Sequence, residues 1–251
     1  METTQPPEFI KLLAHDVRWS LVKALTQSDW QVNELVAQLN QPMNLISYHL
    51  KKMREDSLVT TRRSEADGRD IYYSLNIHRL QKMYHEAGLA LHPAMALNPS
   101  LIDVVHLKQQ TILFVCTHNS VRSQMAEGLL RHLTQGHLTV FSAGSHPTHI
   151  HPDAIRAMDH LGINIRDQQS QSLTDFEGQA FDYVITVCDK AREFCPTFTG
   201  SGMPIHWSFP DPSAIKNETE RQHQFAQTAE QLKSRIEYFL AYLANAERGI
   251  A

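Results

Sequence analysis

Three cysteines carry the most distinctive chemistry in this sequence of 251 residues: Cys116, Cys188 and Cys195. Five residues follow Cys116, then come Arg122 and Ser123, and then the helix-like run QMAEGLLRHL. A loop between a strand and a helix points backbone N–H groups inward, and the helix dipole adds partial positive charge, so such a loop can hold a tetrahedral oxyanion. Arg122 adds a planar fork for two oxygens. The spacing therefore predicts an oxyanion cradle with a cysteine at its base.

The same electrostatic field favours the anionic form of a thiol. A cysteine at a helix N-terminus beside a cation is a nucleophile at neutral pH, and we expect this of Cys116. Ser123 is expected to donate a hydrogen bond to the thiolate, and Asn119 to hold the shape of the loop. A buried structural cysteine is the alternative for any cysteine that follows a strand. The combination of strand, cysteine, arginine, serine and helix argues against it.

Strand-like and helix-like segments alternate around this loop. Strands are expected at residues 111–115, 138–142, 182–187 and 204–207, and helices at 123–133, 152–161 and about 218–244. Such alternation predicts a doubly wound α/β domain with a four-stranded parallel sheet and ligands at the carboxyl ends of its strands.

The first hundred residues follow a different pattern. Apolar residues at helical spacing predict two helices between residues 9 and 25, one over 32–39, one over 44–53 and one over 79–91. Two β-rich runs, 58–61 and 71–75, flank the turn SEADG and predict a hairpin. The chain is thus expected to be multidomain, with a mainly α domain over residues 1–92, a linker over 93–108 and the α/β domain over 109–251.

Composition limits the functional classes. Residues 1–92 hold 11 Lys+Arg and 11 Asp+Glu, so nucleic-acid binding there would have to depend on a local basic patch. No run of 18 apolar residues and no signal-like start occurs, which predicts a cytoplasmic protein without a membrane span. An odd number of cysteines fits reduced, reactive thiols better than structural disulfides.

The cysteine loop resembles that of the low-molecular-weight tyrosine phosphatase fold family, whose phosphate loop is Cys-x5-Arg-Ser after the first strand. The resemblance spans residues 111–250. The family takes its general acid from an Asp-Pro loop, and this sequence offers Phe209-Pro210-Asp211-Pro212. By that resemblance Asp211 is the acid candidate, which would protonate the leaving oxygen.

Within that fold family the sequence is most similar to the thioredoxin-coupled arsenate reductases. All three cysteines occur in their order, and small Ser213 follows the Asp-Pro pair where the phosphatases carry an aromatic residue. The resemblance implies that Cys116 attacks an arsenate oxyanion, that Cys188 attacks Cys116 to release arsenite, and that Cys195 attacks Cys188. Thioredoxin or a similar external thiol would be the reductant, with no tightly bound cofactor and with residual phosphatase activity.

Several alternatives remain for this domain. It could be a protein tyrosine phosphatase in which Cys188 and Cys195 only pack a lid. Residues seven apart in a helix are separated by about 10 Å, so a Cys188–Cys195 disulfide would require the segment to loop or unwind. Some relatives bind potassium near the loop, and Asn119, Glu127 and Ser142 match their ligands, but Gln171 stands where they have an acid. We therefore predict no metal site.

Residues 8–92 resemble the winged helix-turn-helix repressors of the ArsR/SmtB family in FIKLLAHDVRWSLVKAL, ELVAQLNQPMNLISYHLKKMREDSLVTTRR and DGRDIYYSL. The resemblance implies that the helix at 43–53 enters the major groove of an operator in double-stranded DNA. Residues implied to face base edges or phosphates are Asn44, Ser47, Tyr48, His49, Lys51 and Lys52 on that helix, and Arg62, Arg63 and Arg69 on the wing.

Winged repressors pair to match a palindrome, so a homodimer through residues 78–91 and the first helix is implied. The module contains no cysteine, which excludes thiolate sensing within it. The preferred hypothesis is an arsenate reductase fused to a DNA-binding regulator of arsenic resistance. One alternative is a repressor whose C-terminal domain only senses oxyanion or redox state, and another is a helical interaction module without DNA binding.

Overall fold

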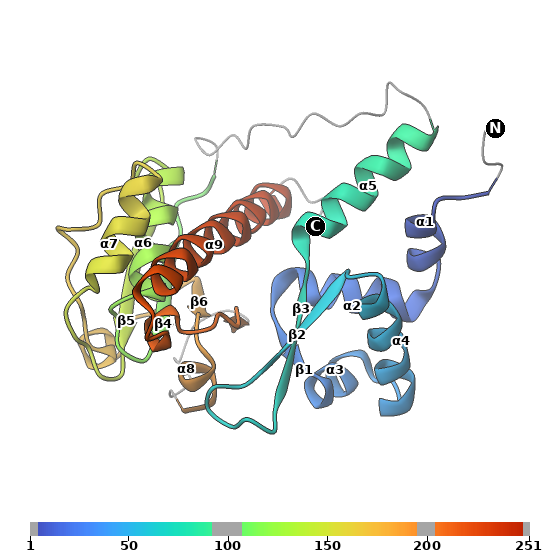
Figure 1. Cartoon of the computed structure of the whole chain (residues 1–251), viewed down its shortest axis with the longest axis horizontal. Helices are drawn as coiled ribbons and strands as arrows, with labels where there is room; N and C mark the ends of the chain where they lie inside the picture. The colour runs from blue at the N-terminus through green and yellow to red at the C-terminus, as the bar shows by residue number, and fades with distance from the viewer. Residues whose placement is uncertain (1–4, 92–106, 195–203, 248–251) are drawn as a thin grey trace. The chain divides into compact units, whose positions relative to one another are not determined.

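The computed structural model describes residues 5–91, 107–194 and 204–247. The chain divides into two compact units, Met1–Leu101 and Ile102–Ala251. Most of the expected linker at 93–108 lies outside the described residues, as does Cys195. The two units are coloured blue to green and green to red in Figure 1.

The described part of the first unit combines helices with a small antiparallel sheet (Figure 1). The hairpin strands β2 and β3 pair as predicted, and a third strand, β1, adds to the far edge of β3. Two residues carry no periodicity, so β1 could not be predicted from the sequence. The elements are α1 Glu8–Leu13, α2 Asp16–Gln27, β1 Trp30–Gln31, α3 Val32–Leu39, α4 Met43–Glu55, β2 Val59–Arg63, β3 Ile71–Leu75 and α5 Ile77–Leu91.

A tight turn joins α3 to α4. Asn40 ends α3 in the left-handed conformation (φ 49°), which asparagine adopts more readily than most residues. Pro42 precedes the first residue of α4, a position where its missing N–H costs nothing. The buried face of α4 comprises Ile46, His49, Leu50 and Met53.

The second unit contains a four-stranded parallel sheet in the order β5-β4-β6-β7, which confirms the expected α/β architecture. The chain passes from β4 to β5 on one side, then crosses to β6 on the other, so β4 lies at the switch point where such sheets bind ligands. The elements are β4 Thr111–Cys116, α6 Arg122–Leu133, β5 Thr139–Gly144, α7 Pro152–His160, η3 Leu173–Phe176, β6 Tyr183–Thr186, α8 Asp189–Phe194, β7 Ile205–His206, η4 Pro212–Ala214 and α9 Glu218–Glu247.

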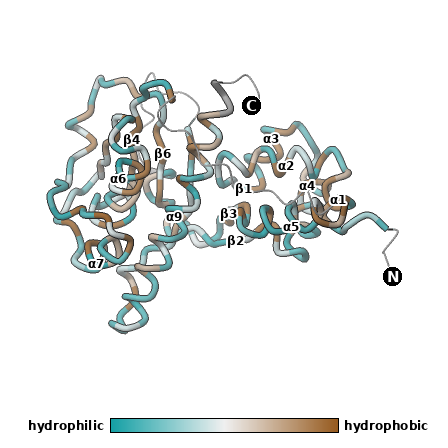
Figure 2. The backbone as a smooth tube through the Cα atoms, turned by 90° about the horizontal axis from the view of Figure 1, so that it is seen from above, coloured by the Kyte–Doolittle hydropathy of each residue, from teal (hydrophilic) through white to brown (hydrophobic). Residues whose placement is uncertain are grey.

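The sheet is covered by helices. Residues 112–115 of β4 have no exposed surface, as expected of a central parallel strand that reads as a continuous apolar run. The tube in Figure 2 is coloured as hydrophobic along β6. The long helix α9 runs alongside α6 and α7 (Figure 1) and buries Phe225, Ala229, Leu232, Ile236 and Leu240 at helical spacing.

Candidate functional site

The cysteine loop runs from the end of β4 to the start of α6. Cys116 is the last residue of β4, and Arg122 is the first residue of α6. Both are buried, as is Ser123 in the first turn of α6. The loop therefore brings together the thiol, the guanidinium and the helix N-terminus that the sequence predicted at the switch point of the sheet.

Two hydrogen bonds converge on the sulfur of Cys116. The backbone N–H of Asn119 donates to Sγ across 3.1 Å, and Ser123 Oγ lies 2.9 Å from Sγ. Asn119 Nδ2 donates to Ser123 Oγ across 2.9 Å, so the serine hydroxyl hydrogen is left to point at the sulfur. Donors aimed at a sulfur stabilise its anionic form, which is the nucleophilic one.

Asn119 holds the loop through both ends of its side-chain amide. Its Nδ2 donates to Ser123 and to Ser142 Oγ (2.7 Å), and its Oδ1 accepts from Gln124 Nε2 (3.0 Å) and from the backbone N–H of Gln171 (2.7 Å). The residue is fully buried and has a positive φ of 46°. Four hydrogen bonds therefore hold the side chain of Asn119 in one position within the loop.

The residues that match the potassium ligands of relatives do not fit a cation site here. Ser142 Oγ accepts from Asn119 and donates to Glu127 Oε2 across 2.5 Å, and Asn119 Oδ1 already accepts two hydrogen bonds. Arg131 lies 2.8 Å from Glu127 and offsets its charge. Burial raises the pKa of Glu127, against the opposing effects of Ser142 and Arg131. The oxygens are thus engaged within the protein.

Arg122 bonds with the segment that contains the Asp-Pro pair. Its Nη1 donates to the carbonyl of Phe209 across 2.8 Å, and its Nη2 lies 3.2 Å from Asp211 Oδ2. Ser213 donates to Asp211 Oδ1 through its backbone N–H (3.0 Å) and its hydroxyl (2.7 Å). Burial acts to raise the pKa of Asp211, but Arg122 and Ser213 outweigh it, so this pKa lies below the usual value.

A general acid must hold a proton, whereas this arrangement keeps Asp211 ionised at neutral pH. The expected acid is thus near the loop but paired with Arg122 as a carboxylate. Arg122 would have to release it, for example to grip an oxyanion, before Asp211 could carry a proton.

Cys188 lies against the loop. It follows β6 and precedes α8, and its Sγ lies 3.5 Å from Thr117 Oγ1, the residue after Cys116. The backbone N–H of Ala191 donates to the same sulfur across 3.4 Å. Burial raises the pKa of Cys188, Arg122 opposes this, and the neighbouring Cys116 adds to it. The second thiol therefore contacts the residue that directly follows Cys116.

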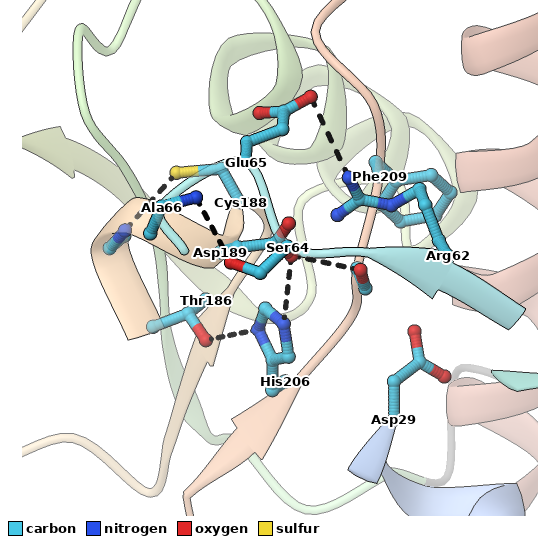
Figure 3. A network of polar contacts seen from close by, with 12 residues as sticks. Asp29, Arg62, Ser64, Glu65, Ala66, Thr186, Cys188, Asp189, His206 and Phe209 are labelled. Atoms are coloured by element: carbon cyan, nitrogen blue, oxygen red, sulfur yellow. Dashed lines mark hydrogen bonds and ion pairs between the residues drawn. The ribbon is translucent and has the colours of Figure 1, made fainter. Parts of the chain in front are cut away.

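Some neighbours of the thiols were missed in the sequence. Thr117 could have been found, because it follows the nucleophile directly. His206 lies between Thr186 and Asp189 and contacts both of them next to Cys188 (Figure 3), and nothing in the spacing of these residues indicates this. Residues Asp189–Phe194 form the helix α8, so a Cys188–Cys195 disulfide would still require this segment to unwind.

Most of the predicted DNA-contacting residues of α4 lie on its exposed face. Asn44, Ser47, Tyr48, Lys51 and Lys52 are all exposed. The exception is His49, and its prediction is wrong. Only 2% of His49 is exposed, and its ring contacts that of His15 in a tilted arrangement, with centroids 4.2 Å apart. The burial of His49 follows from its place on the apolar stripe of the helix, so it cannot reach a base edge.

The three arginines predicted for the wing differ in their exposure and in their hydrogen-bond or ion-pair partners. Arg69 is exposed and forms a two-point ion pair with Asp67, whose pKa falls to about 2 through the side-chain hydrogen bond from Arg69. Arg63 is exposed and donates to the carbonyl of Gly68 across 2.8 Å. Arg62 is half-buried and lies 3.7 Å from Glu65.

Among the residues that the structure describes, no helix is both long and apolar enough to cross a bilayer. In the same ranges, no three His, Cys, Asp or Glu side chains gather in a way that could hold a metal ion.

Comparison with known proteins concerns the second unit. Residues 111–248 match the family model described as low molecular weight phosphotyrosine protein phosphatase. A protein named arsenate reductase from Shouchella clausii is 36% identical over 135 residues, which is 53% of this chain and 96% of that protein. A protein named glutaredoxin arsenate reductase from Synechocystis sp. is 32% identical over 133 residues, with 53% and 98% covered.

A solved structure described as an arsenate reductase in the phosphate binding state aligns with a TM-score of 0.48 and 31% identity. The alignment covers 54% of this chain and 99% of that one.

Proposed function

Since the chain belongs, through residues 111–248, to the low molecular weight phosphotyrosine protein phosphatase family, we propose that this unit is a thiol-dependent arsenate reductase. The single observation that carries the proposal is the position of Cys188 beside the cysteine loop, 3.5 Å from Thr117. Hydrolysis of a phosphate ester needs one nucleophilic thiol, whereas reduction needs two electrons, which a pair of thiols can give. The names of the relatives agree with this choice.

The proposed reaction begins at Cys116. Its thiolate attacks arsenic while the loop N–H groups and Arg122 hold the oxygens, and one oxygen leaves as water after protonation, with Asp211 as the proposed carrier of the proton. Cys188 then attacks the sulfur of Cys116. An S–S bond forms, the S–As bond breaks, and its electron pair reduces the arsenic to arsenite.

Regeneration requires a third thiol. Cys195 would attack Cys188, form the Cys188–Cys195 disulfide and free the Cys116 thiolate, after which external thioredoxin, glutaredoxin or a similar thiol reduces the disulfide. Cys195 lies outside the described residues, so this step rests on the sequence resemblance alone.

The test is a coupled assay with arsenate, thioredoxin, its reductase and NADPH, run on the native chain and on Cys116→Ser, Cys188→Ser and Cys195→Ser. Native protein should consume NADPH when arsenate is added, and each variant should not. Hydrolysis of p-nitrophenyl phosphate that needs Cys116 but survives loss of Cys188 and Cys195, without arsenate turnover, would identify a phosphatase instead.

For the first unit we propose a winged helix-turn-helix module that binds double-stranded DNA. The support is the pair α3 and α4 joined by the tight turn at Asn40, followed by the hairpin of β2 and β3. On this proposal the exposed face of α4 enters the major groove, with Lys51 and Lys52 near phosphates.

Fluorescence anisotropy with a duplex selected from a random library tests the module. Affinity should fall steeply with salt, and Lys51→Ala should make the log–log salt dependence shallower by about one. Lys23→Ala, an exposed lysine on α2, is the matched control and should leave it unchanged. Binding that does not depend on Lys51 would contradict the placement of α4. DNA binding without arsenate turnover in the coupled assay would favour a repressor that only senses oxyanion or redox state.

We also propose that α1 and α5 form a homodimer face. Apolar side chains remain exposed on both helices, and Tyr84 of α5 contacts Phe9 of α1 edge to face. Light scattering should give a dimer for the native chain and a monomer for Leu89→Glu. The exposed apolar residues concerned are Ile10 (45%), Tyr84 (56%), Leu89 (43%) and Leu91 (74%).

A further inference from the structure

A chain of buried polar side chains lies next to Cys188, and the proposed relay does not use it. Strands β6 and β7 pair in parallel with Thr186 opposite His206. Thr186 Oγ1 lies 2.8 Å from His206 Nδ1, within hydrogen-bond distance. The other ring nitrogen, Nε2, faces Asp189 Oδ1 at 3.4 Å, which is an ion-pair distance for a protonated ring and not a hydrogen bond. Figure 3 shows the imidazole between Thr186 and Asp189, with Cys188 beside them. One ring thus links the ends of two strands to the start of α8.

Asp189 is the residue directly after Cys188 and the first residue of α8. It has no exposed surface, and Ser208 Oγ donates to its Oδ1 across 2.8 Å. A buried carboxylate is costly unless hydrogen bonds and opposite charge compensate it, so its partners fix where it can lie. His206 and Ser208 are therefore among the partners that hold the first turn of α8 in place.

The sulfur of Cys188 depends on that turn. The N–H of Ala191 donates to Cys188 Sγ across 3.4 Å, and the N–H of Arg192 donates to the carbonyl of Cys188 across 3.2 Å. A shift of Asp189 would move Cys188 with it, because the two residues share a peptide bond. The residue after Ser208 is Phe209, whose carbonyl accepts from Arg122 of the cysteine loop. The same short segment thus anchors α8 and the oxyanion-binding arginine.

We propose that His206 and Asp189 are positioning residues that hold Cys188 in line for attack on the sulfur of Cys116. The proposal rests on the proposed function, in that Cys188 is taken as the second thiol. Neither residue touches the reacting atoms. Their effect should appear in the step where the S–S bond forms, because a misplacement of about 1 Å at a reacting atom can cost about a hundredfold in rate.

Formation of the Cys116–Cys188 disulfide can be measured without arsenate. A Cys195→Ser substitution is added to every protein so that the reaction stops at this disulfide. Hydrogen peroxide oxidises the Cys116 thiolate to a sulfenic acid and is reduced to water. The Cys188 thiolate then attacks that sulfur, the S–S bond forms, the S–O bond breaks and hydroxide leaves. Quenching with an alkylating agent and mass analysis gives the rate of disulfide formation. Trapping with dimedone in an added Cys188→Ser background gives the rate of Cys116 oxidation alone.

Two substitutions of the histidine separate its two contacts. His206→Gln places an amide near the position of Nε2 and keeps the reach to Asp189, whereas His206→Asn reaches only toward Thr186. Disulfide formation should slow by about tenfold or more in His206→Asn and in Asp189→Asn, and by about threefold or less in His206→Gln. Cys116 oxidation should stay within about twofold in all of them, since the loop is intact.

Two results would overturn the proposal. One is disulfide formation at the native rate in His206→Asn and Asp189→Asn. The other is a parallel loss of disulfide formation and Cys116 oxidation, which would mean that the residues support the whole unit and not Cys188. Ser208→Ala, which removes one hydrogen bond to Asp189, gives a milder second variant and should slow disulfide formation alone. No step of this experiment uses arsenate. The rates of disulfide formation can therefore be interpreted even if the protein does not reduce arsenate.

Discussion

The side-chain amide of Asn119 fixes the direction of the Ser123 hydroxyl. Asn119 Nδ2 donates to Ser123 Oγ across 2.9 Å, and Ser123 Oγ lies 2.9 Å from Cys116 Sγ. A hydroxyl has one hydrogen, so when Asn119 occupies a lone pair of the oxygen, that hydrogen is directed at the sulfur. A second amide hydrogen of Asn119 goes to Ser142 and prevents the amide from turning away.

Ser123→Ala should slow alkylation of Cys116 by iodoacetamide at pH 7. A hydrogen bond to a charged group contributes about 1.5–3 kcal/mol, so its loss should lower the rate of attack by the sulfur by about 10- to 100-fold. Ser120→Ala is the control, because it removes a hydroxyl from the same loop, whereas the hydrogen bonds to the sulfur come from Ser123 and the backbone of Asn119. Equal rates in the two variants would show that the hydroxyl does not stabilise the thiolate.

Gly144→Ala should displace the cysteine loop. A Cβ on Gly144 would lie 2.7 Å from the carbonyl oxygen of Thr117 and 2.8 Å from the backbone N of Asn119, and backbone atoms cannot move aside cheaply. The alkylation rate of Cys116 should fall by about tenfold or more. Gly68→Ala, where the Cβ would meet nothing within 4 Å, should leave the rate unchanged. A native alkylation rate in Gly144→Ala would contradict the close packing of Gly144 against the backbone of Thr117 and Asn119.

Asp211 should stabilise the fold at neutral pH and lose this effect in acid. Its pKa is below the usual value because Arg122 and Ser213 outweigh the effect of burial. A lowered carboxyl pKa gives stability that is complete above the unfolded value of ~3.9 and disappears as the pH falls through the folded value. The difference in free energy of unfolding between native protein and Asp211→Asn should therefore favour native protein at pH 7. It should shrink steadily below about pH 5 in urea titrations. A difference that does not change with pH would rule out this ion pair as its source.

His49 should destabilise the first unit in mild acid. Burial is the main cause of its lowered pKa, with His15, Arg18 and Lys52 adding to it. Within the described residues neither ring nitrogen of His49 has a hydrogen-bond partner. Above the unfolded pKa of ~6.5 both states are neutral, and below it the unfolded state binds a proton that the folded state resists, so stability falls.

The matching variant is His49→Leu, which keeps the buried volume and removes the titration. Thermal unfolding of the native chain should lose more stability than the variant between about pH 7 and pH 5. If both lose the same amount, His49 does not drive the change.

The cysteine loop was predictable because it is local. Strand, thiol, arginine and helix follow one another within a dozen residues. A parallel sheet places the end of each strand at one edge, so Cys188 lies at the same edge as the cysteine loop. The link between His206 and Asp189 depends instead on the pairing of β7, a strand of two residues, with β6. No periodicity can show such a pairing.

The error over His49 had a signal in the sequence. Ile46, Leu50 and Met53 mark the inner face of α4, and position 49 falls on the same face at helical spacing. The family resemblance favoured a residue type suited to base contacts over that periodicity. The pairing of Asp211 with Arg122 could not be predicted from the sequence, because 89 residues separate the two and only the folded chain brings them together.

Redesign of the oxyanion loop is constrained most strongly at Asn119. A single side chain there ties together the loop, the first turn of α6, strand β5 and the segment at Gln171, so any replacement has to satisfy four sites at once. The adjoining His118 is exposed. Efforts to alter which anions the loop accepts would therefore do best to vary position 118 and to leave its neighbour untouched.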